Sequence, residues 1–178
     1  ATAADTAARA LISLVNAVVY IGDLRFTRQE RMRWLNAQLA ACRQVGDRQG
    51  EGAALGNLGS AYADLGDARR AIELYEQSLA IRRAIGDRRA EGQDLGNLGT
   101  AYYALGDDRR AIELYEQRLT IARAIGDRQG EGAALGNLGL AYARLGDARR
   151  AIEFHEQALV ISRAIGDRQG EGQDLGNL

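Results

Sequence analysis

Residues 46–85 read GDRQGEGAALGNLGSAYADLGDARRAIELYEQSLAIRRAI, and a closely similar sequence recurs over residues 86–125 and 126–165. The first and third copies agree at 33 of 40 positions, and the first and second copies agree at 29 of 40. A fourth copy begins at Gly166 and stops within the unit at Leu178, so we expect the parent protein to continue. Self-similarity at a fixed period predicts an array in which each unit packs on the next.

Each unit contains two patterns of apolar residues with the spacing of a helix. They are Leu55, Leu58, Tyr62 and Leu65 in the first pattern, and Ile72, Tyr75 and Leu79 in the second. A Gly-Asp pair follows each pattern, since Gly favours the left-handed C-terminal cap and Asp caps the amides of the next helix. We therefore expect a helix A over Arg48–Leu65 and a helix B over Ala68–Ile85, antiparallel because the turns are short.

The first 45 residues read as a diverged unit of the same kind. Ile21-Gly22-Asp23 matches the turn at residues 65–67, and residues 28–45 align with helix B of the first full copy. A divergent end unit is expected, because its outer face does not meet another repeat.

Composition excludes several classes of protein. One Cys (Cys42) and one His (His155) are too few for a disulfide framework or a multi-His metal centre, and all 23 basic residues are Arg, which excludes lysine chemistry. A net charge of −1 gives no general attraction to nucleic acid or anionic membrane. The apolar run 10–21 is too short to span a bilayer. We expect no enzyme activity, cofactor or metal, neither a nucleic-acid nor a membrane partner, and a cytoplasmic location.

The repeated residues resemble the tetratricopeptide repeat. That pattern combines a Leu-Gly pair and a Tyr in the first helix with Ala, an aromatic and a small residue in the second. In the first copy these are Leu58-Gly59, Tyr62, Ala71, Tyr75 and Ser78, and the later copies keep Leu98-Gly99, Tyr102, Ala111, Tyr115, Leu138-Gly139, Tyr142 and Ala151. The unit departs from the family in being 40 residues long rather than about 34 and in lacking a terminal Pro. Arg118 replaces the small residue and His155 the aromatic.

The resemblance implies an all-α, right-handed solenoid of antiparallel helix pairs. We assign a diverged pair to residues 1–45, three repeats to 46–85, 86–125 and 126–165, and the first helix of a fourth to 166–178. The long Leu-Gly-Asn form is similar to repeats of spindle-orientation adaptors, kinesin light chains and the sensor arrays of bacterial signalling ATPases of the STAND class. Such arrays bind a peptide or protein on the concave helix-A face, so we expect a binding module within a larger signalling protein.

One stripe on helix A, with steps of three and four residues, keeps a single polar residue constant and varies around it. The constant residue forms a ladder of Asn57, Asn97, Asn137 and Asn177. An amide can pair with a peptide backbone whatever its sequence, and the varied neighbours can supply specificity. The candidate peptide-binding residues beside the ladder are Gln93, Ser60, Thr100, Tyr103, Asp64 and Arg144. The alternative is that each Asn bonds within the scaffold between adjacent helices.

Two other functions stay open: self-association through the last helix, whose Leu175 and Leu178 would form an apolar edge, and small-molecule sensing as part of a STAND-type ATPase.

Several remaining residues have structural explanations. We expect exposed ion pairs at Arg69–Glu73, Arg109–Glu113 and Arg149–Glu153, and a structural role for the Glu that recurs at residues 51, 91, 131 and 171. The helix-A glycines predict close helix approach, chiefly at the positions of Gly56 and Gly59, whereas Gly50 and Gly52 would leave the first turn pliable. Arg118 either reaches the surface or makes a local contact.

Overall fold

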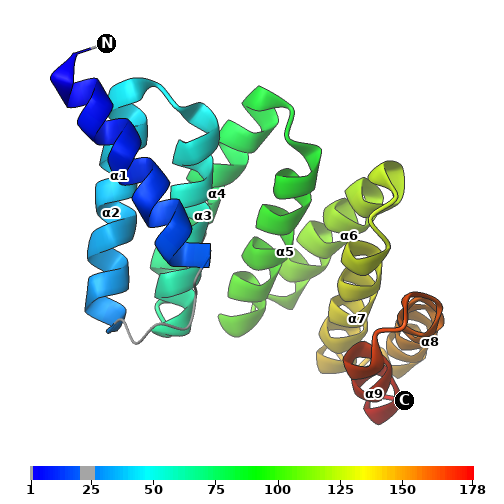
Figure 1. Cartoon of the computed structure of the whole chain (residues 1–178). Coiled ribbons are helices and arrows are strands. Elements are labelled where there is room, and N and C mark those ends of the chain that lie inside the picture. The colour runs from blue at the N-terminus through cyan, green and yellow to red at the C-terminus, as the bar shows by residue number, and fades with distance from the viewer. Residues whose placement is uncertain (1, 21–26) are drawn as a thin grey trace. The chain divides into compact units, whose positions relative to one another are not determined.

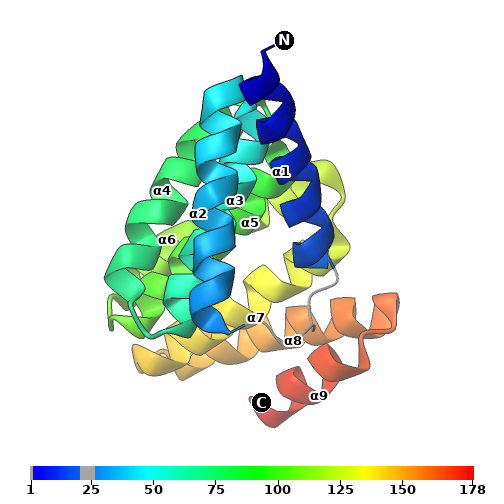
Figure 2. The same cartoon turned by 60° about the vertical axis from the view of Figure 1, so that its left-hand side comes forward.

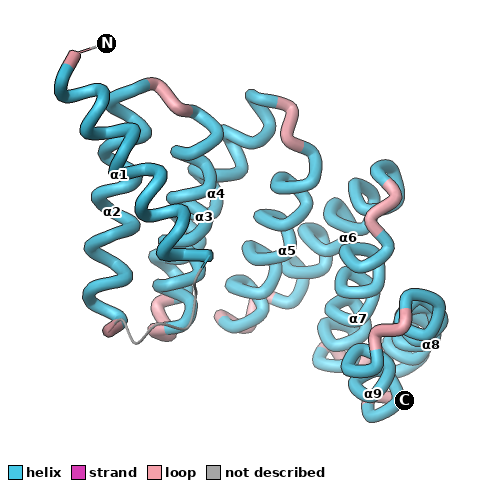
Figure 3. Tube along the Cα trace, viewed as in Figure 1, coloured by secondary structure: helices cyan, strands magenta, loops and turns pink. Residues whose placement is uncertain are grey.

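The computed structural model describes residues 2–20 and 27–178, and in this part of the chain it contains nine helices and no strand. The helices are α1 (Ala3–Tyr20), α2 (Arg28–Val45), α3 (Arg48–Asp64), α4 (Ala68–Ile85), α5 (Arg88–Ala104), α6 (Asp108–Ile125), α7 (Arg128–Arg144), α8 (Ala148–Ile165) and α9 (Arg168–Gly176). Short turns join consecutive helices from α2 to α9 (Figure 3). The all-α repeat fold is confirmed, and α3 and α4 match the expected helices A and B to within one residue.

The helices form two compact units, residues 1–86 and residues 87–178. In the first unit, α2 packs on α1 and α3, and α3 packs on α4 (Figure 1). Its core is formed by apolar residues of α2, α3 and α4, namely Leu35, Leu39, Ala54, Leu55, Leu58, Ala61, Leu74 and Ile81. The apolar positions that repeat at helical spacing in the sequence are therefore the ones that fill this core.

The second unit contains α5 to α9, in which each helix from α5 to α8 packs on the next one. Its core combines apolar residues of α6, α7 and α8: Ala111, Ile112, Tyr115, Leu119, Ala134, Leu135, Leu138, Ala141, Ala158 and Ile161. Alanine recurs among these residues because small side chains allow neighbouring helices to lie close together.

Gly-Asp pairs make the turns, as the sequence predicts. Asp47 accepts a hydrogen bond from the amide of Gly50 at 2.9 Å, and the Asp of every later pair caps its helix in the same way. The preceding glycines, from Gly46 to Gly166, have φ between 70° and 83°, which favours Gly over other residues. The corresponding turn at Gly22 lies outside the described residues.

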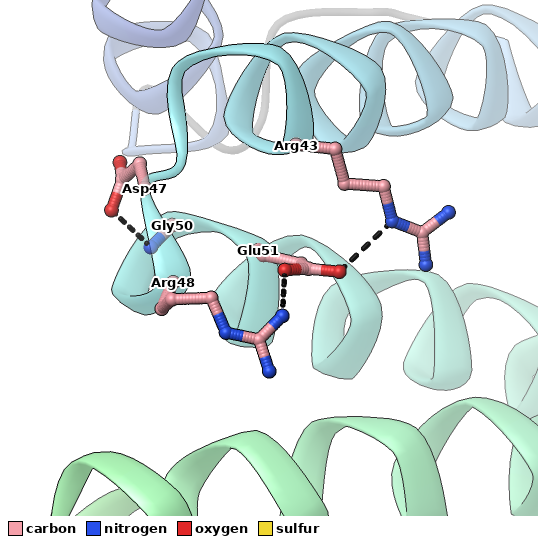
Figure 4. A network of polar contacts seen from close by, with 5 residues as sticks. All are labelled: Arg43, Asp47, Arg48, Gly50 and Glu51. Carbon is pink, nitrogen blue, oxygen red and sulfur yellow. Dashed lines mark hydrogen bonds and ion pairs between the residues drawn. The ribbon is translucent and has the colours of Figure 1, made fainter.

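A buried glutamate near the start of helix A binds α3 to α2 in the first unit and α7 to α6 in the second. Glu51 accepts from Arg43 Nε at 2.9 Å and from Arg48 Nη1 at 2.5 Å (Figure 4). Glu131 repeats both contacts with Arg123 and Arg128. The two carboxylate oxygens thus bind two half-exposed arginines from consecutive helices, which gives the recurring Glu a structural role.

The predicted close approach of a neighbouring helix to the helix-A glycines is confirmed at the position of Gly59 and only in part at the position of Gly56. A Cβ on Gly99 would lie 2.5 Å from Cε1 of Tyr115, and Gly59 and Gly139 meet the ring of the following helix B in the same way. Gly136, two repeats after Gly56, has only an ordinary contact at 3.6 Å, whereas a Cβ on Gly96, one repeat after Gly56, would lie 2.3 Å from Arg118 Nη1. The glycine opposite the ring is therefore closely approached in all three repeats, and the position of Gly56 only where an arginine passes beside it.

The first turn of helix A is also less open than expected. A Cβ on Gly50 would lie 2.4 Å from the carboxylate of its own cap, Asp47, and one on Gly132 would lie 3.2 Å from Ile161. These glycines therefore lie against neighbouring side chains, which is a second reason for glycine here, and the pliability of the turn stays a prediction.

Two of the three expected surface ion pairs form with the neighbouring arginine instead. Glu73 binds Arg70 at 2.5 Å, and Glu113 binds Arg110 at 2.5 Å. The predictions for Arg69 and Arg109 are wrong, since the arginine three residues before each Glu is as near a neighbour on the helix as the one four residues before it. Only Arg149–Glu153, at 3.1 Å, forms as predicted.

Candidate functional site

The second unit brings helix A of three successive repeats together. α5 packs on α7 and α7 packs on α9, whereas α6 and α8 make no comparable contact within this unit, all of whose residues are described. Figure 2 shows the last pair, α8 and α9, side by side. Because the A helices lie closer together than the B helices, the A side is the inner side of this unit.

The ladder asparagines of this unit point away from its core. Asn97 and Asn177 are exposed and Asn137 is half-buried. None of these three side chains forms a hydrogen bond with another described residue. Asn57 of the first unit is likewise half-buried and forms none. Each amide therefore keeps its two donors and its acceptor for water or a ligand.

The two candidate hydroxyls already have partners within the scaffold. Ser60 accepts a hydrogen bond from the Tyr75 hydroxyl at 3.0 Å, and Thr100 accepts one from Tyr115 at 3.2 Å. Each also donates to a backbone carbonyl one turn earlier on its own helix. These hydroxyls position the aromatic ring that lies on the helix-A glycine.

Tyr103 and Arg144, which are far apart in the sequence, form one cluster. The Arg144 guanidinium lies 3.4 Å from the centre of the Tyr103 ring, donates to the Tyr103 carbonyl and binds Asp108 Oδ1 through Nε at 2.6 Å. The hydrogen bond from Arg144 to Asp108 raises the pKa of Arg144. Arg144 thus ties α7 to the start of α6. In the first unit, the candidate residue Asp64 forms an ion pair with Arg31, in which Asp64 Oδ2 lies 3.5 Å from Arg31 Nη1.

A small hollow lies where α5, α6 and α7 meet, and we call it the Arg118 hollow. It has a volume of about 10 Å³, enough for one water, and is lined by Arg89, Gly92, Gln93, Arg118, Asp127 and Gly130 among others. Burial lowers the pKa of Arg118, and the charge of Asp127 opposes this effect. Arg118 donates no hydrogen bond to a described residue and passes so close to Gly96 that a Cβ there would lie 2.3 Å from its Nη1. Arg118 therefore makes a local contact.

A larger groove lies one repeat further on, where α7, α8 and α9 meet, and we call it the Asp174 groove. Its volume is about 230 Å³, and its polar lining consists of Gln129, Asn137, Ser162, Asp167, Gln173, Asp174 and Asn177. Asp174 is 6% exposed and accepts a hydrogen bond from the Ser162 hydroxyl at 3.2 Å. The ladder residues Asn137 and Asn177 therefore border a groove that has a buried carboxylate.

His155 lies beside this groove, at the position of Tyr115 in the preceding repeat. It is 1% exposed, and its Nδ1 has no hydrogen-bond partner and lies 3.7 Å from Asp174 Oδ1. The Asp174 carboxylate lies between Ser162 and the imidazole, so the hydroxyl donates to the carboxylate and not to the histidine. This order does not activate Ser162 as a nucleophile.

Sequence reasoning missed the residues that give these two places their charge. It did not identify Asp174, it placed Arg89 only among the varied residues of the helix-A stripe, and it left Arg118 undecided. A signal was present, because residues 93–94 and 173–174 read Gln-Asp where residues 53–54 and 133–134 read Ala-Ala.

Two further features bear on possible chemistry. Among the described residues, no group of three or more His, Cys, Asp or Glu side chains could hold a metal ion, and no helix is long and apolar enough to cross a bilayer. Cys42 is buried, and burial raises the pKa of its thiol, which disfavours the reactive thiolate.

Comparison with known families gives one clear match. The family model for the tetratricopeptide repeat matches residues 33–84, 51–124 and 95–164, which together span more than half of the chain. No curated protein sequence matches the chain.

Several solved structures share the fold at low sequence identity. Aspartyl phosphate phosphatase F from Bacillus subtilis has a TM-score of 0.83 at 13% identity, over 98% of this chain and 45% of that one. A STAND protein with a tetratricopeptide repeat sensor from Pyrococcus horikoshii has a TM-score of 0.81 at 20% identity, over 99% of this chain and 27% of that one. Kinesin light chain-like repeats from Podosopora anserina have a TM-score of 0.67 at 22% identity, over 97% of this chain and 93% of that one. The chain thus spans less than half the length of the first two proteins.

Proposed function

The chain belongs to the tetratricopeptide repeat family, and from this premise we propose that it binds a peptide or partner protein on the helix-A side of α5, α7 and α9. The Asn ladder makes the sequence-independent contacts in this proposal. The ligand is an extended segment whose backbone groups pair with the amides of Asn97, Asn137 and Asn177.

One observation carries the proposal: the ladder amides are free. An Asn held for the scaffold would form hydrogen bonds with neighbouring helices, as Ser60 and Thr100 do with tyrosines. Asn97 and Asn137 form none with the described chain, although the repeat retains them in every copy. Amides on the inner side of the unit, with their donors and acceptors unoccupied, favour contact with a ligand.

The other candidate residues have different parts in this proposal. Gln93 is exposed on the same face as Asn97 and would contact the ligand directly. Thr100 and Ser60 would act through the aromatic rings that they hold, and Tyr103 through the face opposite Arg144. Asn57 and Asp64 belong to the first unit, where they would form the equivalent ligand surface of α3.

The chain would then be the sensor or scaffold part of a larger cytoplasmic signalling protein. Similarity in fold to the sensor-bearing STAND protein supports this assignment, and the chain covers 27% of that protein. In such a protein, a ligand bound to the repeats would control an effector domain elsewhere in the sequence.

A displayed-peptide selection tests the binding function. The affinity of the selected peptides would be measured for the wild type and for the double variant Asn97→Ala with Asn137→Ala. We expect the double variant to bind at least about tenfold more weakly, because hydrogen bonds to the peptide are lost. The matched control is Gln117→Ala with Gln157→Ala, which removes two exposed amides from helix B. Circular dichroism should show equal helix content in all variants. Equal affinity of the Asn variant and the wild type would refute the ladder.

Self-association is a second candidate, favoured by an exposed apolar side chain of α8. Val160 is 65% exposed, at the position where the preceding repeats carry Ala80 and Thr120. Side chains of this kind in contact with water favour association with another copy. Light scattering across a concentration series would show a dimer if this face associates, and a constant monomer mass would exclude it.

A further inference from the structure

The Asp174 groove has a negative charge that no basic residue of its lining offsets. Two carboxylates, Asp167 and Asp174, contribute to it, and its other polar side chains are amides and one hydroxyl. Asp167 caps α9 through the amide of Gly170 at 2.9 Å. Asp174 is the buried carboxylate, so its unoccupied acceptor positions decide what the groove can bind.

Asp174 has only part of its hydrogen-bonding capacity in use. Its Oδ2 accepts from Ser162, and its Oδ1 accepts no hydrogen bond from the described chain, because His155 Nδ1 is too distant at 3.7 Å. An ionised carboxylate has about four acceptor positions, and buried polar groups in native proteins are nearly always satisfied. A donor supplied by a ligand would complete this site.

The remainder of the groove suits a long side chain with a charged end. Leu140 and Ile165 give apolar walls, against which methylene groups can pack. The amides of Asn137 and Asn177 lie at the same groove and can bind the backbone of the residue that carries this side chain. A volume of about 230 Å³ accommodates one such side chain but not a folded domain.

The preceding repeat shows what the same place looks like without this function. In the Arg118 hollow, the positions of Ser162 and Asp174 hold Ala122 and Ala134. Arg118 fills the space there, and two arginines face one carboxylate, Asp127. A cation is therefore repelled from the hollow and attracted to the groove, which fixes the position of a basic residue along the helix-A face.

We propose that the Asp174 groove receives an arginine side chain of the ligand, whose guanidinium donates to Asp174. This inference rests on the proposed function, since it names one residue of the bound segment. Arginine is preferred to lysine because its planar group can donate two parallel hydrogen bonds to a carboxylate.

Small probes test the groove without a known partner. N-acetyl-arginine methylamide would be titrated into the ¹⁵N-labelled chain, with N-acetyl-citrulline methylamide as the uncharged equivalent. We expect the arginine probe to shift the side-chain amide signals of Asn137 and Asn177, and the citrulline probe to leave them unchanged.

The chain itself supplies a fold-compatible variant. Ser162→Ala with Asp174→Ala copies the residues of the preceding repeat, and we expect it to weaken arginine binding by at least about tenfold. Glu156→Gln, which removes one exposed carboxylate from α8, is the matched control and should bind as the wild type does. Equal shifts with the two probes, or unchanged binding by the copied variant, would overturn the proposal.

The peptide selection separates this inference from the proposed function. Peptides that need Asn97 and Asn137 but bind the copied variant as tightly as the wild type would overturn the arginine assignment alone. Peptides whose one arginine is required, and whose affinity falls in the copied variant, would support both. If no displayed peptide binds while the arginine probe does, the groove assignment stands and the proposed function fails.

Discussion

The Arg118 hollow and the Asp174 groove occupy the same place in successive repeats, yet they carry opposite charge and differ in volume from about 10 to about 230 Å³. Three positions account for the change in charge: Arg89 becomes Gln129, Arg118 becomes Ala158, and Ala134 becomes Asp174. A fourth change, Ala122 to Ser162, adds the hydroxyl that donates to the new carboxylate. The removal of one arginine side chain opens the space, and the added carboxylate gives it its charge.

The scaffold around these positions stays the same. Gly99 and Gly139 each face a ring of the next helix, and each helix A begins with a capping Asp. Buried leucines such as Leu98 and Leu138 occupy equivalent core positions. A repeat can therefore change its ligand-facing residues while the helix packing is retained, because the two sets of positions lie on different faces of helix A.

Transfer of the groove residues into the hollow is the strongest test of this comparison. The variant Arg89→Gln, Arg118→Ala, Ala122→Ser and Ala134→Asp gives the preceding repeat the charges of the following one and the hydroxyl that donates to its carboxylate. We expect it to bind a second equivalent of the arginine probe, measured by isothermal titration calorimetry.

The control for this transfer is the pair Arg89→Gln and Arg118→Ala alone, which removes the positive charge without adding a carboxylate. It should bind a single equivalent. If the control and the complete transfer bind alike, the carboxylate does not distinguish the two places, and loss of the arginines is sufficient.

The ring positions of the two repeats differ in a way that affects stability. The Tyr115 hydroxyl is bound by Thr100, whereas His155 has Leu140 at the corresponding position and an unpartnered Nδ1. Replacing both, His155→Tyr with Leu140→Thr, restores the hydrogen bond and removes a buried unsatisfied group. We expect a gain of about 1 kcal/mol in the free energy of unfolding, measured by urea denaturation.

Each single substitution should give less than the pair, since either change alone leaves a polar group without its partner. A pair no more stable than the wild type would mean that the His155 environment compensates for the missing hydrogen bond. The positions of Tyr115 and His155 would then contribute equally to the free energy of unfolding.

Most of the fold could be predicted from local signals. The helix bounds followed from apolar spacing and from Gly-Asp pairs, because capping and the left-handed glycine act within a few residues. The choice of Arg70 over Arg69 for Glu73 could not be predicted, since positions three and four residues away are both neighbours on a helix. In the third repeat Glu153 binds Arg149 instead, although Arg150 also lies over the ring of Tyr142.

The candidate site was less accessible to sequence reasoning. The Asn ladder could be identified as a constant polar position, but its free amides are visible only in the structure. The cluster of Arg144, Asp108 and Tyr103 joins residues up to 41 positions apart, and no local pattern predicts it. The path of Arg118 beside Gly96 likewise depends on how α5 and α6 pack.

The smallest expected effect concerns the glycine beside each site. Gly136 has only Asp174 Oδ1 near its missing Cβ, at 3.6 Å, whereas a Cβ on Gly96 would collide with the Arg118 guanidinium. Gly136→Ala should therefore stabilise the chain by up to about 1 kcal/mol through helix propensity. Gly96→Ala should give no gain, because Arg118 must leave the hollow to make room for the new methyl group.

Removal of Arg118 tests this explanation by urea denaturation. In an Arg118→Ala background, Gly96→Ala should recover the stabilisation seen at Gly136, since both methyl groups then meet open space or ordinary contacts. If Gly96→Ala stays neutral without Arg118, the backbone rather than the arginine limits that position. The two places would then differ in helix packing as well as in their side chains, and copying four residues would not suffice to turn one into the other.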